Sequence, residues 1–403
     1  MKTGPCHCDS SGDGEHRIVG RENRPGHQRI PAVAVLPQGL EEAGAQELID
    51  LGAKAVRPLR RAAAFEAELA CLYRLHLQCR LPFRLLRELS RFPCDGRDSL
   101  YHGVQNSVDW ERWLHPSMSF RVDATGSAQG LNHSHYSALQ VKNAIVDRQR
   151  ELWGERSSID LEEPDLHLHL HLGRGDAVLS LDGCGGSLHR RGYRAAMGAA
   201  PLKENLAAGL IRLTGWDGTT PLVDPLCGSG TLLIEAACLA LQQAPGLNRS
   251  FALEGWADFD AELWRDECER ARRRSQPQQP LAPILGWEQD AAIAEQARSN
   301  VAAAGLEASI RIHTGDFRAL SLPPGPGTLV CNPPYGERIG ADEDLDSLYA
   351  DLGQVVKRDA SGWELWLLSG NPQLTGALRM KASRRIPISN GGLDCRWLHY
   401  AIR

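Results

Sequence analysis

Short apolar stretches alternate with longer helical patterns throughout residues 221–368, and this alternation constrains the fold more than any other feature. Strand-like stretches cover residues 221–223, 283–286, 309–313, 327–331 and 364–368, and helical patterns cover 231–242, 291–304 and 345–358. Strands that alternate with helices favour βαβ units and a mostly parallel sheet. We therefore predict a Rossmann-like α/β domain over the second half of the chain.

The first half has a different pattern, which is typical of an α+β unit. Strand patterns cover 32–36, 119–124, 165–172 and 177–181, and helical patterns cover 39–51, 66–79, 82–91 and 135–152. The last two strand patterns indicate a hairpin. Residues 1–28 contain almost no large apolar side chains, so we expect a flexible leader there. The segment 270–280, rich in Arg, Ser, Gln and Pro, is expected to be a charged loop.

Composition and charge exclude several classes of protein. The 403 residues hold 45 Lys and Arg against 50 Asp and Glu, a net charge of −5 at pH 7. Nucleic-acid contacts must therefore rest on local patches. No apolar run reaches the ~18 residues of a membrane span, and no apolar signal core opens the chain. Eleven cysteines without a paired framework indicate free thiols in a reducing cytoplasm.

One local patch of positive charge stands out in the first half. Residues 54–91 carry nine Lys and Arg against three Asp and Glu. An RNA-facing surface explains this excess, and a solvated helical face explains it equally well.

Two groups of residues have side chains that could ligate a metal. Cys6-His7-Cys8 lacks a second pair at the spacing of a zinc finger. His167, His169 and His171 share one face of a strand pattern, but no acidic or cysteine partner is placed nearby by the sequence. A polar outer face of a half-buried strand explains the three histidines better. We predict no metal site.

The loop after the first strand of the second half suits a cationic ligand. It reads Asp224-Pro225-Leu226-Cys227-Gly228-Ser229-Gly230-Thr231. Its glycines let the backbone turn sharply and pass close to a ligand. It has neither the Lys-Ser/Thr of a phosphate-binding loop nor the glycine spacing of dinucleotide sites. The leading acid disfavours phosphate and fits the sulfonium and ammonium groups of S-adenosylmethionine.

Acidic residues follow the next two predicted strands. Glu288 and Asp290 come at the end of the second strand, and Asp316 comes at the end of the third. Open α/β sheets bind ligands at these carboxyl ends, where a carboxylate can accept both hydrogens of a ribose diol. We assign that role to Glu288 first and Asp290 second, and we expect Asp316 to accept from an adenine amino group. Each acid alone could be a helix cap, but three at successive strand ends favour a ligand site.

The fourth predicted strand runs into Asn332-Pro333-Pro334-Tyr335. The two prolines restrict the backbone and hold Asn332 extended at the strand end. Its side-chain oxygen and the Pro333 carbonyl can accept from an NH₂ group and aim the nitrogen lone pair at an electrophilic methyl. Tyr335 offers a flat face on which an extruded base can stack. The pattern predicts in-line methyl transfer to an amine, with positioning as the main contribution.

These motifs in this order resemble class I S-adenosylmethionine-dependent amino-methyltransferases of the Asn-Pro-Pro-Tyr type. The segments 187–194, 200–206 and 390–396 narrow the resemblance to THUMP-domain RNA methyltransferases. Within that group the chain is similar to the bacterial RlmL/YpsC-like family, whose characterised member methylates the N2 amine of guanine in 23S rRNA. The resemblance covers about residues 30–403.

The resemblance implies a domain order and a site. It places a ferredoxin-like segment at 29–75, a THUMP RNA-binding module at 76–185 and a methyltransferase domain at 186–403, after the leader at 1–28. It assigns catalysis to Asn332, Pro333, Pro334 and Tyr335. It assigns binding of RNA phosphates to Arg190, Arg191 and Arg194. The cofactor set, with S-adenosylmethionine as cofactor, is Lys203, Glu204, Asn205, Asp224, Pro225, Gly228, Ser229, Gly230, Thr231, Glu288, Asp290 and Asp316.

The chain departs from the family in two respects. Glu288 stands where the family usually has Asp, and we expect the longer carboxylate to reach the ribose still. Some members carry a second methyltransferase domain after the first. This sequence has the pattern of one such domain, so we expect a single activity.

Other functions fit parts of the pattern. A DNA methyltransferase acting on adenine N6 or cytosine N4 fits residues 329–335, and a protein-glutamine methyltransferase also uses Asn-Pro-Pro-Tyr, but neither explains the first 185 residues. A tRNA guanine-N2 methyltransferase shares the predicted chemistry. An RNA-binding assembly factor with a vestigial methyltransferase half is the non-enzyme alternative.

Overall fold

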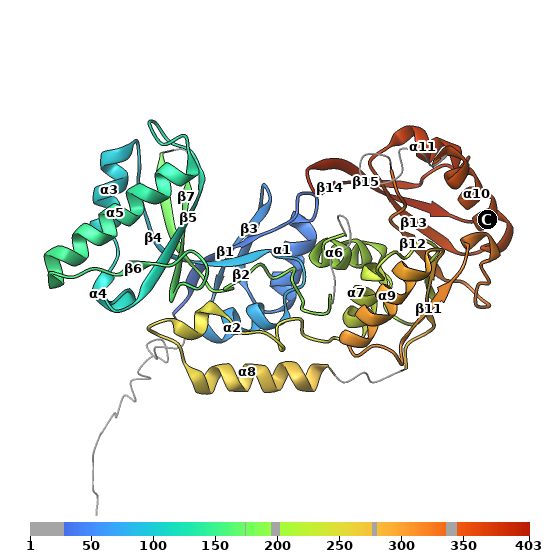
Figure 1. Cartoon of the computed structure of the whole chain (residues 1–403), viewed down its shortest axis with the longest axis horizontal. Coiled ribbons are helices and arrows are strands. Elements are labelled where there is room, and N and C mark those ends of the chain that lie inside the picture. The colour runs from blue at the N-terminus through green and yellow to red at the C-terminus, as the bar shows by residue number, and fades with distance from the viewer. Residues whose placement is uncertain (1–27, 174, 195–201, 276–279, 336–344) are drawn as a thin grey trace, which may run out of the picture.

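The computed structural model describes residues 28–173, 175–194, 202–275, 280–335 and 345–403. Two β-sheets with their covering helices lie side by side along the long axis of an elongated molecule (Figure 1). The first sheet, drawn in blue and green, belongs to the first half of the chain, and the second, in yellow to red, belongs to the second half. The leader expected at 1–28, including Cys6-His7-Cys8, lies outside the described residues except for its last position.

The first sheet has eight strands in the order β2-β3-β1-β4-β8-β7-β5-β6. These are β1 (Ile30–Val35), β2 (Lys54–Leu59), β3 (Ala62–Ala67), β4 (Arg84–Pro93), β5 (Ser119–Gly126), β6 (Ser158–Ile159), β7 (Leu166–Leu172) and β8 (Asp176–Asp182). The accompanying helices are α1 (Glu41–Asp50), α2 (Leu69–Gln78), α3 (Arg97–Asn106), α4 (Trp110–Trp113) and α5 (Ser134–Trp153). The α+β character expected of the first half is confirmed.

Strand β4 corrects one prediction, because residues 82–91 are not helical. It pairs antiparallel with β1 on one side and with β8 on the other. Leu85 and Leu86 are both buried, so their close spacing comes from a strand covered on both faces, not from one face of a helix. Pairing with segments far away in the sequence overrides the local periodicity here.

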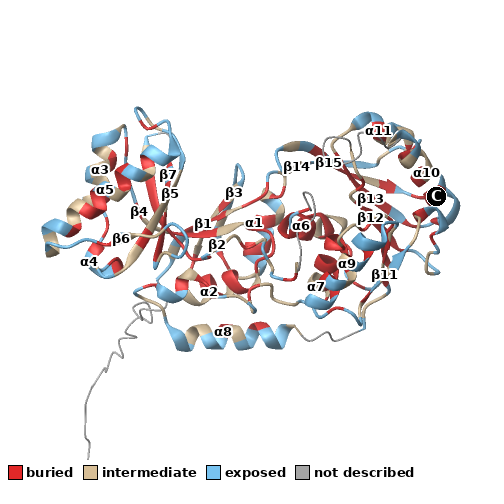
Figure 2. Cartoon of the chain, in the orientation of Figure 1, coloured by how far each residue is buried: buried red, intermediate tan, exposed pale blue. Residues whose placement is uncertain are grey.

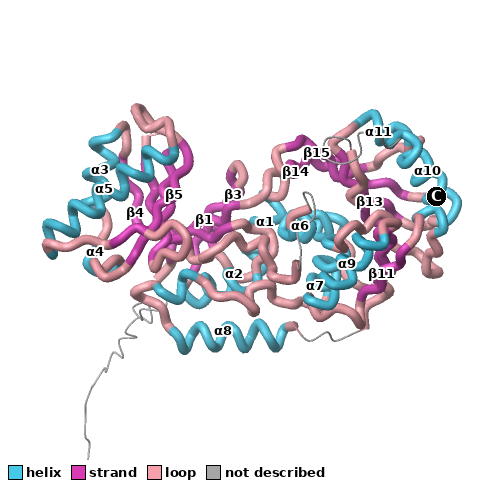
Figure 3. The backbone as a smooth tube through the Cα atoms, in the orientation of Figure 1, coloured by secondary structure: helices cyan, strands magenta, loops and turns pink. Residues whose placement is uncertain are grey.

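The second sheet has seven strands in the order β11-β10-β9-β12-β13-β15-β14, shown in magenta in Figure 3. These are β9 (Leu222–Asp224), β10 (Ile284–Glu288), β11 (Ile310–Thr314), β12 (Thr328–Cys331), β13 (Glu364–Ser369), β14 (Arg384–Asn390) and β15 (Leu393–Ala401). Its helices are α6 (Glu204–Thr214), α7 (Thr231–Ala240), α8 (Ala261–Arg274), α9 (Ala291–Ala303), α10 (Leu345–Asp359) and α11 (Pro372–Ala377), with short 3₁₀ turns η1 (Ala252–Gly255) and η2 (Phe317–Ala319).

The central strands of this sheet are parallel, as predicted. Strand β9 lies between β10 and β12, and β13 follows β12, all in parallel register. The carboxyl ends of β9, β10, β11 and β12 therefore meet along one edge, which is where open α/β sheets hold ligands. The Rossmann-like prediction is confirmed, whereas the antiparallel hairpin β14–β15 at the far edge was not anticipated.

A segment between α7 and β10 crosses back to the first half of the chain. We call residues 246–275 the strap; it includes α8, which runs along the lower side of the molecule beneath α2 (Figure 1). Phe251, Leu253 and Trp256 are buried in the same hydrophobic cluster as Tyr73 of α2. The helix also continues through residues 270–274, so the charged loop expected at 270–280 is wrong for that part, and 276–279 lie outside the described residues.

Ion pairs attach the strap as well as apolar contacts. Arg87 forms a bidentate pair with Asp258 at 2.7 and 2.8 Å, and Arg74 forms one with Glu267 at 2.8 and 3.0 Å. The carboxylate of Glu267 is fully buried. A buried carboxylate is costly unless it is paired in this way, so these contacts fix the strap to α2 and β4.

The first half also touches the second sheet directly. The amide of Ser389 in β14 donates to the Gln38 carbonyl at 3.1 Å. Gly39, at φ +94°, packs so closely on the Pro387 carbonyl that a β-carbon there would lie 2.2 Å from its oxygen, and only glycine accepts both constraints. Leu40 next to it is fully buried in the core that contains α6 and Trp366. Figure 2 shows buried residues continuing from one half into the other.

Candidate active site

The Asp224 loop joins β9 to α7 and has open space around Gly228. Asp224 is the last residue of β9 and is 1% exposed. Burial raises the pKa of its carboxyl to about 8, opposed by a hydrogen bond from the Leu226 amide and reinforced by the negative charge of Glu288. A β-carbon at Gly228 would meet nothing within 4 Å. A buried carboxyl beside an open glycine loop is suited to a cationic ligand, which would restore the ionised form.

Glu288 links this loop to the next strand end. Its Oε2 accepts from the Gly228 amide at 3.1 Å, and its Oε1 accepts from the Asp290 amide at 2.9 Å. Each carboxylate oxygen retains acceptor capacity for a further donor. The longer side chain of Glu thus reaches both the glycine loop and the edge of the sheet.

The other two predicted acids also have local partners. Asp290 caps α9, because its Oδ1 accepts from the amides of residues 292 and 293. Asp316 caps the turn η2 and pairs with Arg318 at 2.6 Å. Gly315, just before it, donates its amide to the Glu288 carbonyl at 2.9 Å. The backbone thus brings Glu288 and Asp316 together at the sheet edge, while Asp290 acts as a helix cap.

Asn332 directly follows β12, and its Oδ1 is a buried acceptor for which the described residues provide no hydrogen-bond donor. An unsatisfied buried acceptor costs about 1–3 kcal/mol, so its persistence points to a donor that arrives with a ligand. Tyr349 donates its hydroxyl to the Pro334 carbonyl at 3.3 Å. The Tyr335 hydroxyl accepts from Asn390 Nδ2 at 2.7 Å. Both contacts fix the loop on which Asn332 lies.

The start of α6 adjoins the glycine loop through an arginine. Arg194 pairs with Glu204 at 2.9 Å and donates to Thr231 Oγ1 at 3.1 Å. Glu204 is buried, and burial raises the pKa of its carboxyl, opposed by the charge of Arg194. Asn205 instead faces the first half, where it donates to the Leu81 carbonyl at 3.0 Å. Lys203 is exposed, with its ammonium 5.1 Å from the centre of the Phe83 ring.

Two of the three arginines predicted to bind RNA are not available at the surface. The side chain of Arg191 is 5% exposed, and it donates to the carbonyls of Leu188 and Arg80 and lies 3.5 Å from Glu235. Arg194 is 12% exposed and engaged as described above. The structure therefore does not support RNA contacts by Arg191 and Arg194, because internal partners already hold them. Arg190 is exposed, and its role remains a prediction.

Sequence reasoning missed several contacts that shape the site. Asn300 of α9 donates to the Ser229 carbonyl at 3.0 Å, and Arg194, assigned to RNA, instead holds Thr231. Asn390 lies in a segment that carried the family resemblance, but no local pattern pairs it with Tyr335. Each contact joins residues far apart in the sequence, so periodicity and spacing contain no signal for it.

The residues at this edge fit S-adenosylmethionine. The buried Asp224, whose pKa is raised by burial, heads the loop in which Gly228 has open space around it, and Glu288 retains acceptor capacity. The unpaired Asn332 oxygen lies at the end of β12, which pairs with β9. The arrangement therefore offers acceptors for a cation, for a ribose and for an amine at the ends of neighbouring strands.

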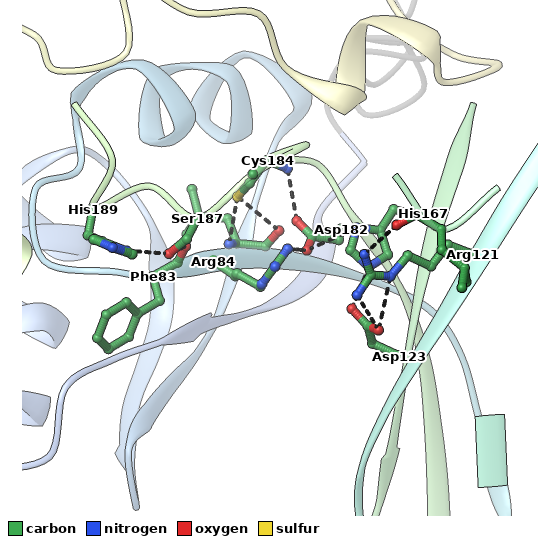
Figure 4. Close-up of polar contacts among 12 residues, drawn as sticks. Phe83, Arg84, Arg121, Asp123, His167, Asp182, Cys184, Ser187 and His189 are labelled. Carbon is green, nitrogen blue, oxygen red and sulfur yellow. Dashed lines mark hydrogen bonds and ion pairs between the residues drawn. The ribbon is translucent and has the colours of Figure 1, made fainter. Parts of the chain in front are cut away.

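His167 of β7 belongs to a polar network, shown in Figure 4. The buried His167 contacts Asp123 at 2.8 Å and Asp182 at 3.6 Å. Arg84 pairs with Asp182, and Arg121 with Asp123. His167 thus faces the interior, not the solvent as expected. In the described ranges, no cluster of three or more His, Cys, Asp or Glu side chains is placed to hold a metal ion.

Within the described residues, no helix has both the length and the apolar content that a membrane-spanning segment requires.

Comparison with known proteins identifies the family. Residues 191–399 match the RMKL-like methyltransferase domain, residues 98–182 match the THUMP domain, and residues 32–86 match the RlmL ferredoxin-like domain. The first of these covers half of the chain. The protein belongs to the RMKL-like methyltransferase family. It is an enzyme of the class I fold, and S-adenosylmethionine is its methyl donor.

Curated relatives of this RMKL-like methyltransferase extend over nearly its whole length. It is 41% identical over 373 residues to slr0064 of Synechocystis sp., named as an RNA methyltransferase, which covers 92% of this chain and 97% of that protein. It is 42% identical to the ribosomal RNA large subunit methyltransferase K/L of Syntrophotalea carbinolica over 93% of this chain. The match covers 54% of that relative, so the chain spans about half the length of the K/L proteins.

Solved structures agree in fold across the whole chain. SMU.472, a methyltransferase complexed with SAH, superposes with a TM-score of 0.84 at 28% identity, covering 93% of this chain and 99% of that one. A Listeria monocytogenes protein named as an N6-adenine-specific DNA methylase superposes with a TM-score of 0.84 at 29% identity. The match covers 94% of this chain and 98% of that one. The SAH in the first of these structures agrees with the methyl donor assigned above.

Proposed function

We propose that this RMKL-like methyltransferase transfers a methyl group to the exocyclic N2 amine of a guanine in 23S rRNA. The observation that carries the chemistry is the buried Asn332 oxygen, which has no partner among the described residues. An exocyclic amine would satisfy it and would be held with its nitrogen facing the cofactor. The names of the K/L relatives, which act on large-subunit ribosomal RNA, support the choice of substrate.

The predicted residues at the strand ends of the second sheet have the following roles in this proposal. S-adenosylmethionine supplies an electrophilic methyl group when bound. Asp224 and residues 228–231 bind its cationic methionine end, Glu288 binds the ribose, and Asp316 accepts from the adenine amine. Asn332 and the Pro333 carbonyl accept hydrogen bonds from the two N–H groups of the target amine, while Tyr335 stacks on the base. One proton of the amine leaves to water once the new N–C bond has formed. Positioning and exclusion of water account for the rate, because no strong base is required.

The first half supports an RNA substrate. The THUMP match at 98–182 lies in the first sheet, which the strap and the contacts of Gly39 attach to the catalytic half. We therefore propose that residues 29–75 and 76–185 form the RNA-recognising part and that 186–403 form the catalytic part. The strap is an exception, because it lies within 186–403 and packs on α2.

Adenine N6 of DNA is the second candidate target. The Listeria monocytogenes structure, with its N6-adenine-specific DNA methylase name, favours it. The Asn332 oxygen accepts an adenine amine as readily as a guanine amine, so the motif alone does not separate them. Two further possibilities are methylation of a guanine in tRNA and a role in assembly without catalytic activity. The experiment below distinguishes both from the proposed function.

The cytoplasm is the proposed compartment. The nine cysteines in the described ranges are all free, and seven of them are buried. Free thiols are typical of reducing compartments.

The experiment compares nucleosides from wild-type cells and from cells that lack this protein by mass spectrometry of 23S rRNA, 16S rRNA, tRNA and DNA. Loss of one N2-methylguanosine from 23S rRNA is the expected result. Loss from tRNA would keep the chemistry and change the substrate, and loss of N6-methyladenine from DNA would favour the second candidate. Unchanged nucleosides in all four pools would contradict the proposed function.

A further inference from the structure

The positive charges of the first half divide into two groups. Arg74, Arg84, Arg87 and Arg91 are held in ion pairs, so the excess noted at residues 54–91 is partly neutralised. Of the other five cations in that segment, Arg80 is buried and donates to a backbone carbonyl, and the remaining four lie on β2 and on the turn that follows it. Arg57, Arg60 and Arg61 are exposed there, and none forms an ion pair with another residue that the structure describes. Strand β2 is the outer strand of its sheet.

A matching group lies on the outer strand of the catalytic sheet. Lys381 precedes β14, and Arg384 and Arg385 begin it. All three are exposed, and within the described ranges they too lack ion pairs. The guanidinium of Arg384 lies 5.6 Å from the centre of the Trp366 ring. Trp366 belongs to the same core as Leu40, so Arg384 is on the side of the sheet that faces the first half.

Backbone contacts connect the two groups. The Arg61 carbonyl accepts from the Leu36 amide at 2.8 Å, and the backbone amide of Arg61 donates to the Glu41 carboxylate at 3.0 Å. Glu41 also accepts from the Gly39 amide at 2.7 Å. Gln38 and Gly39 in turn contact Ser389 and Pro387 of β14. Figure 1 shows the β2–β3 turn, the start of α1 and β14 in succession along the upper side of the molecule.

Strand β14 leads from this surface to the candidate site. It ends at Asn390, whose amide holds Tyr335. At about 3.3 Å per residue, Arg384 lies roughly 20 Å along the strand from Asn390. A polynucleotide strand that leaves the site along β14 would therefore pass several of these cations with its phosphates.

We propose that Arg57, Arg60, Arg61, Lys381 and Arg384 form a basic ridge that binds the phosphates of the RNA strand flanking the target nucleotide; Arg385 is left out because neighbouring strand residues lie on opposite faces of the sheet. The inference rests on the proposed RNA substrate. Charge complementarity identifies the partner, because unpaired cations on a chain of net charge −5 create a local positive potential on the surface that leads to the site. Phosphate contacts of this kind fix the register of a nucleic acid without reading its sequence.

Protection of exposed strand edges is the competing explanation, since charged side chains there prevent pairing with other chains. The two explanations predict different effects of charge reversal. A glutamate protects an edge as well as an arginine does, but it repels phosphate. Arg60→Glu combined with Arg384→Glu is therefore the test variant. Arg311→Glu is the control for a single charge reversal at a strand edge, because Arg311 is exposed on β11, at the opposite edge of the same sheet. Arg384→Glu alone, which also changes the net charge by −2, is compared with it.

The measurement is binding of deproteinised 23S rRNA by the full chain across a range of salt concentrations, together with S-adenosylmethionine affinity. We expect the ridge variant to bind RNA about tenfold more weakly, with the slope of log Kd against log salt lowered by about 0.7–0.9 for each lost contact. Its KM for RNA should rise while kcat and cofactor affinity stay unchanged, and the control should match wild type.

Two other outcomes separate the two proposals. If the wild-type protein methylates RNA and the ridge variant keeps the wild-type affinity and salt slope, the ridge proposal is overturned and the proposed function stands. Wild type that neither binds nor methylates any RNA would overturn the proposed function and the ridge together.

Discussion

The side-chain amide of Asn390 donates a hydrogen bond to the Tyr335 hydroxyl across 2.7 Å, and it thereby joins the last hairpin of the chain to the loop of Asn332. The residue before it, Ser389, donates its amide to Gln38 in the first half. The loop that we assign to the target base is therefore held by a hairpin that the RNA-recognising half itself contacts.

Removing either partner of this hydrogen bond should weaken catalysis through the same interaction. A neutral hydrogen bond contributes about 1 kcal/mol net, so Asn390→Ala and Tyr335→Phe should each lower kcat/KM for RNA about fivefold. The double variant should lose little more than Tyr335→Phe alone, because that change already removes the hydrogen bond that Asn390→Ala breaks. Steady-state kinetics of the four proteins gives the coupling energy, and fully additive losses would contradict this positioning role.

Asn332→Ala should lower turnover by about 10² to 10³, the usual effect of removing one preorganised hydrogen-bond partner from an active site. Affinity for S-adenosylmethionine should remain near wild type, because Asn332 is assigned to the target amine. Asn332→Asp keeps an acceptor at the same position and should retain more activity. Calorimetric titration with the cofactor and single-turnover kinetics provide the two readouts, and a matching loss in both would place Asn332 in the cofactor site instead.

Cofactor affinity should increase with pH up to about 8 and then level off. Burial raises the pKa of Asp224 to about 8, so below that pH the carboxyl is mostly neutral. A cationic ligand favours the ionised form, and binding must then release a proton, which makes affinity rise with pH. Calorimetry in buffers of different ionisation enthalpy measures the released proton directly.

The Asp224→Asn variant is the control for this effect. It should bind the cofactor at least about tenfold more weakly above pH 8, since hydrogen bonds to charged groups contribute about 1.5–3 kcal/mol. It should also lose the part of the pH dependence that belongs to Asp224 and retain that of the ligand itself. Equal affinity in the variant and the wild type would remove Asp224 from the cofactor site.

The strap should be part of the cooperative core. Glu267→Ala leaves Arg74 without its partner, and loss of one member of a buried pair costs about 3–5 kcal/mol. Glu269→Ala, on an exposed position of the same helix, should change the free energy of unfolding by less than about 0.5 kcal/mol. Urea unfolding of both variants checks this, and equal stability of the two would mean that the strap is not tightly docked.

Most of the catalytic half could be predicted from local patterns. Buried parallel strands are continuous apolar stretches, and the residues that follow them must share one edge of the sheet. Asp224, Glu288, Asp316 and Asn332 could therefore be placed together before any coordinates were known. The glycines at 228 and 230, both at positive φ, are likewise a local requirement of the turn into α7.

Contacts between distant segments were decided only by the tertiary structure. The sequence pattern of β4 indicated a helix because its two neighbours, β1 and β8, are remote in sequence. Arg191 was predicted to be a surface cation because its partner Glu235 lies on the remote helix α7. The contacts of Glu267 with Arg74 and of Asn390 with Tyr335 likewise join residues that are remote in the sequence. Local patterns encode which face of an element is buried, whereas the identity of the partner across that face depends on the packing of the whole chain.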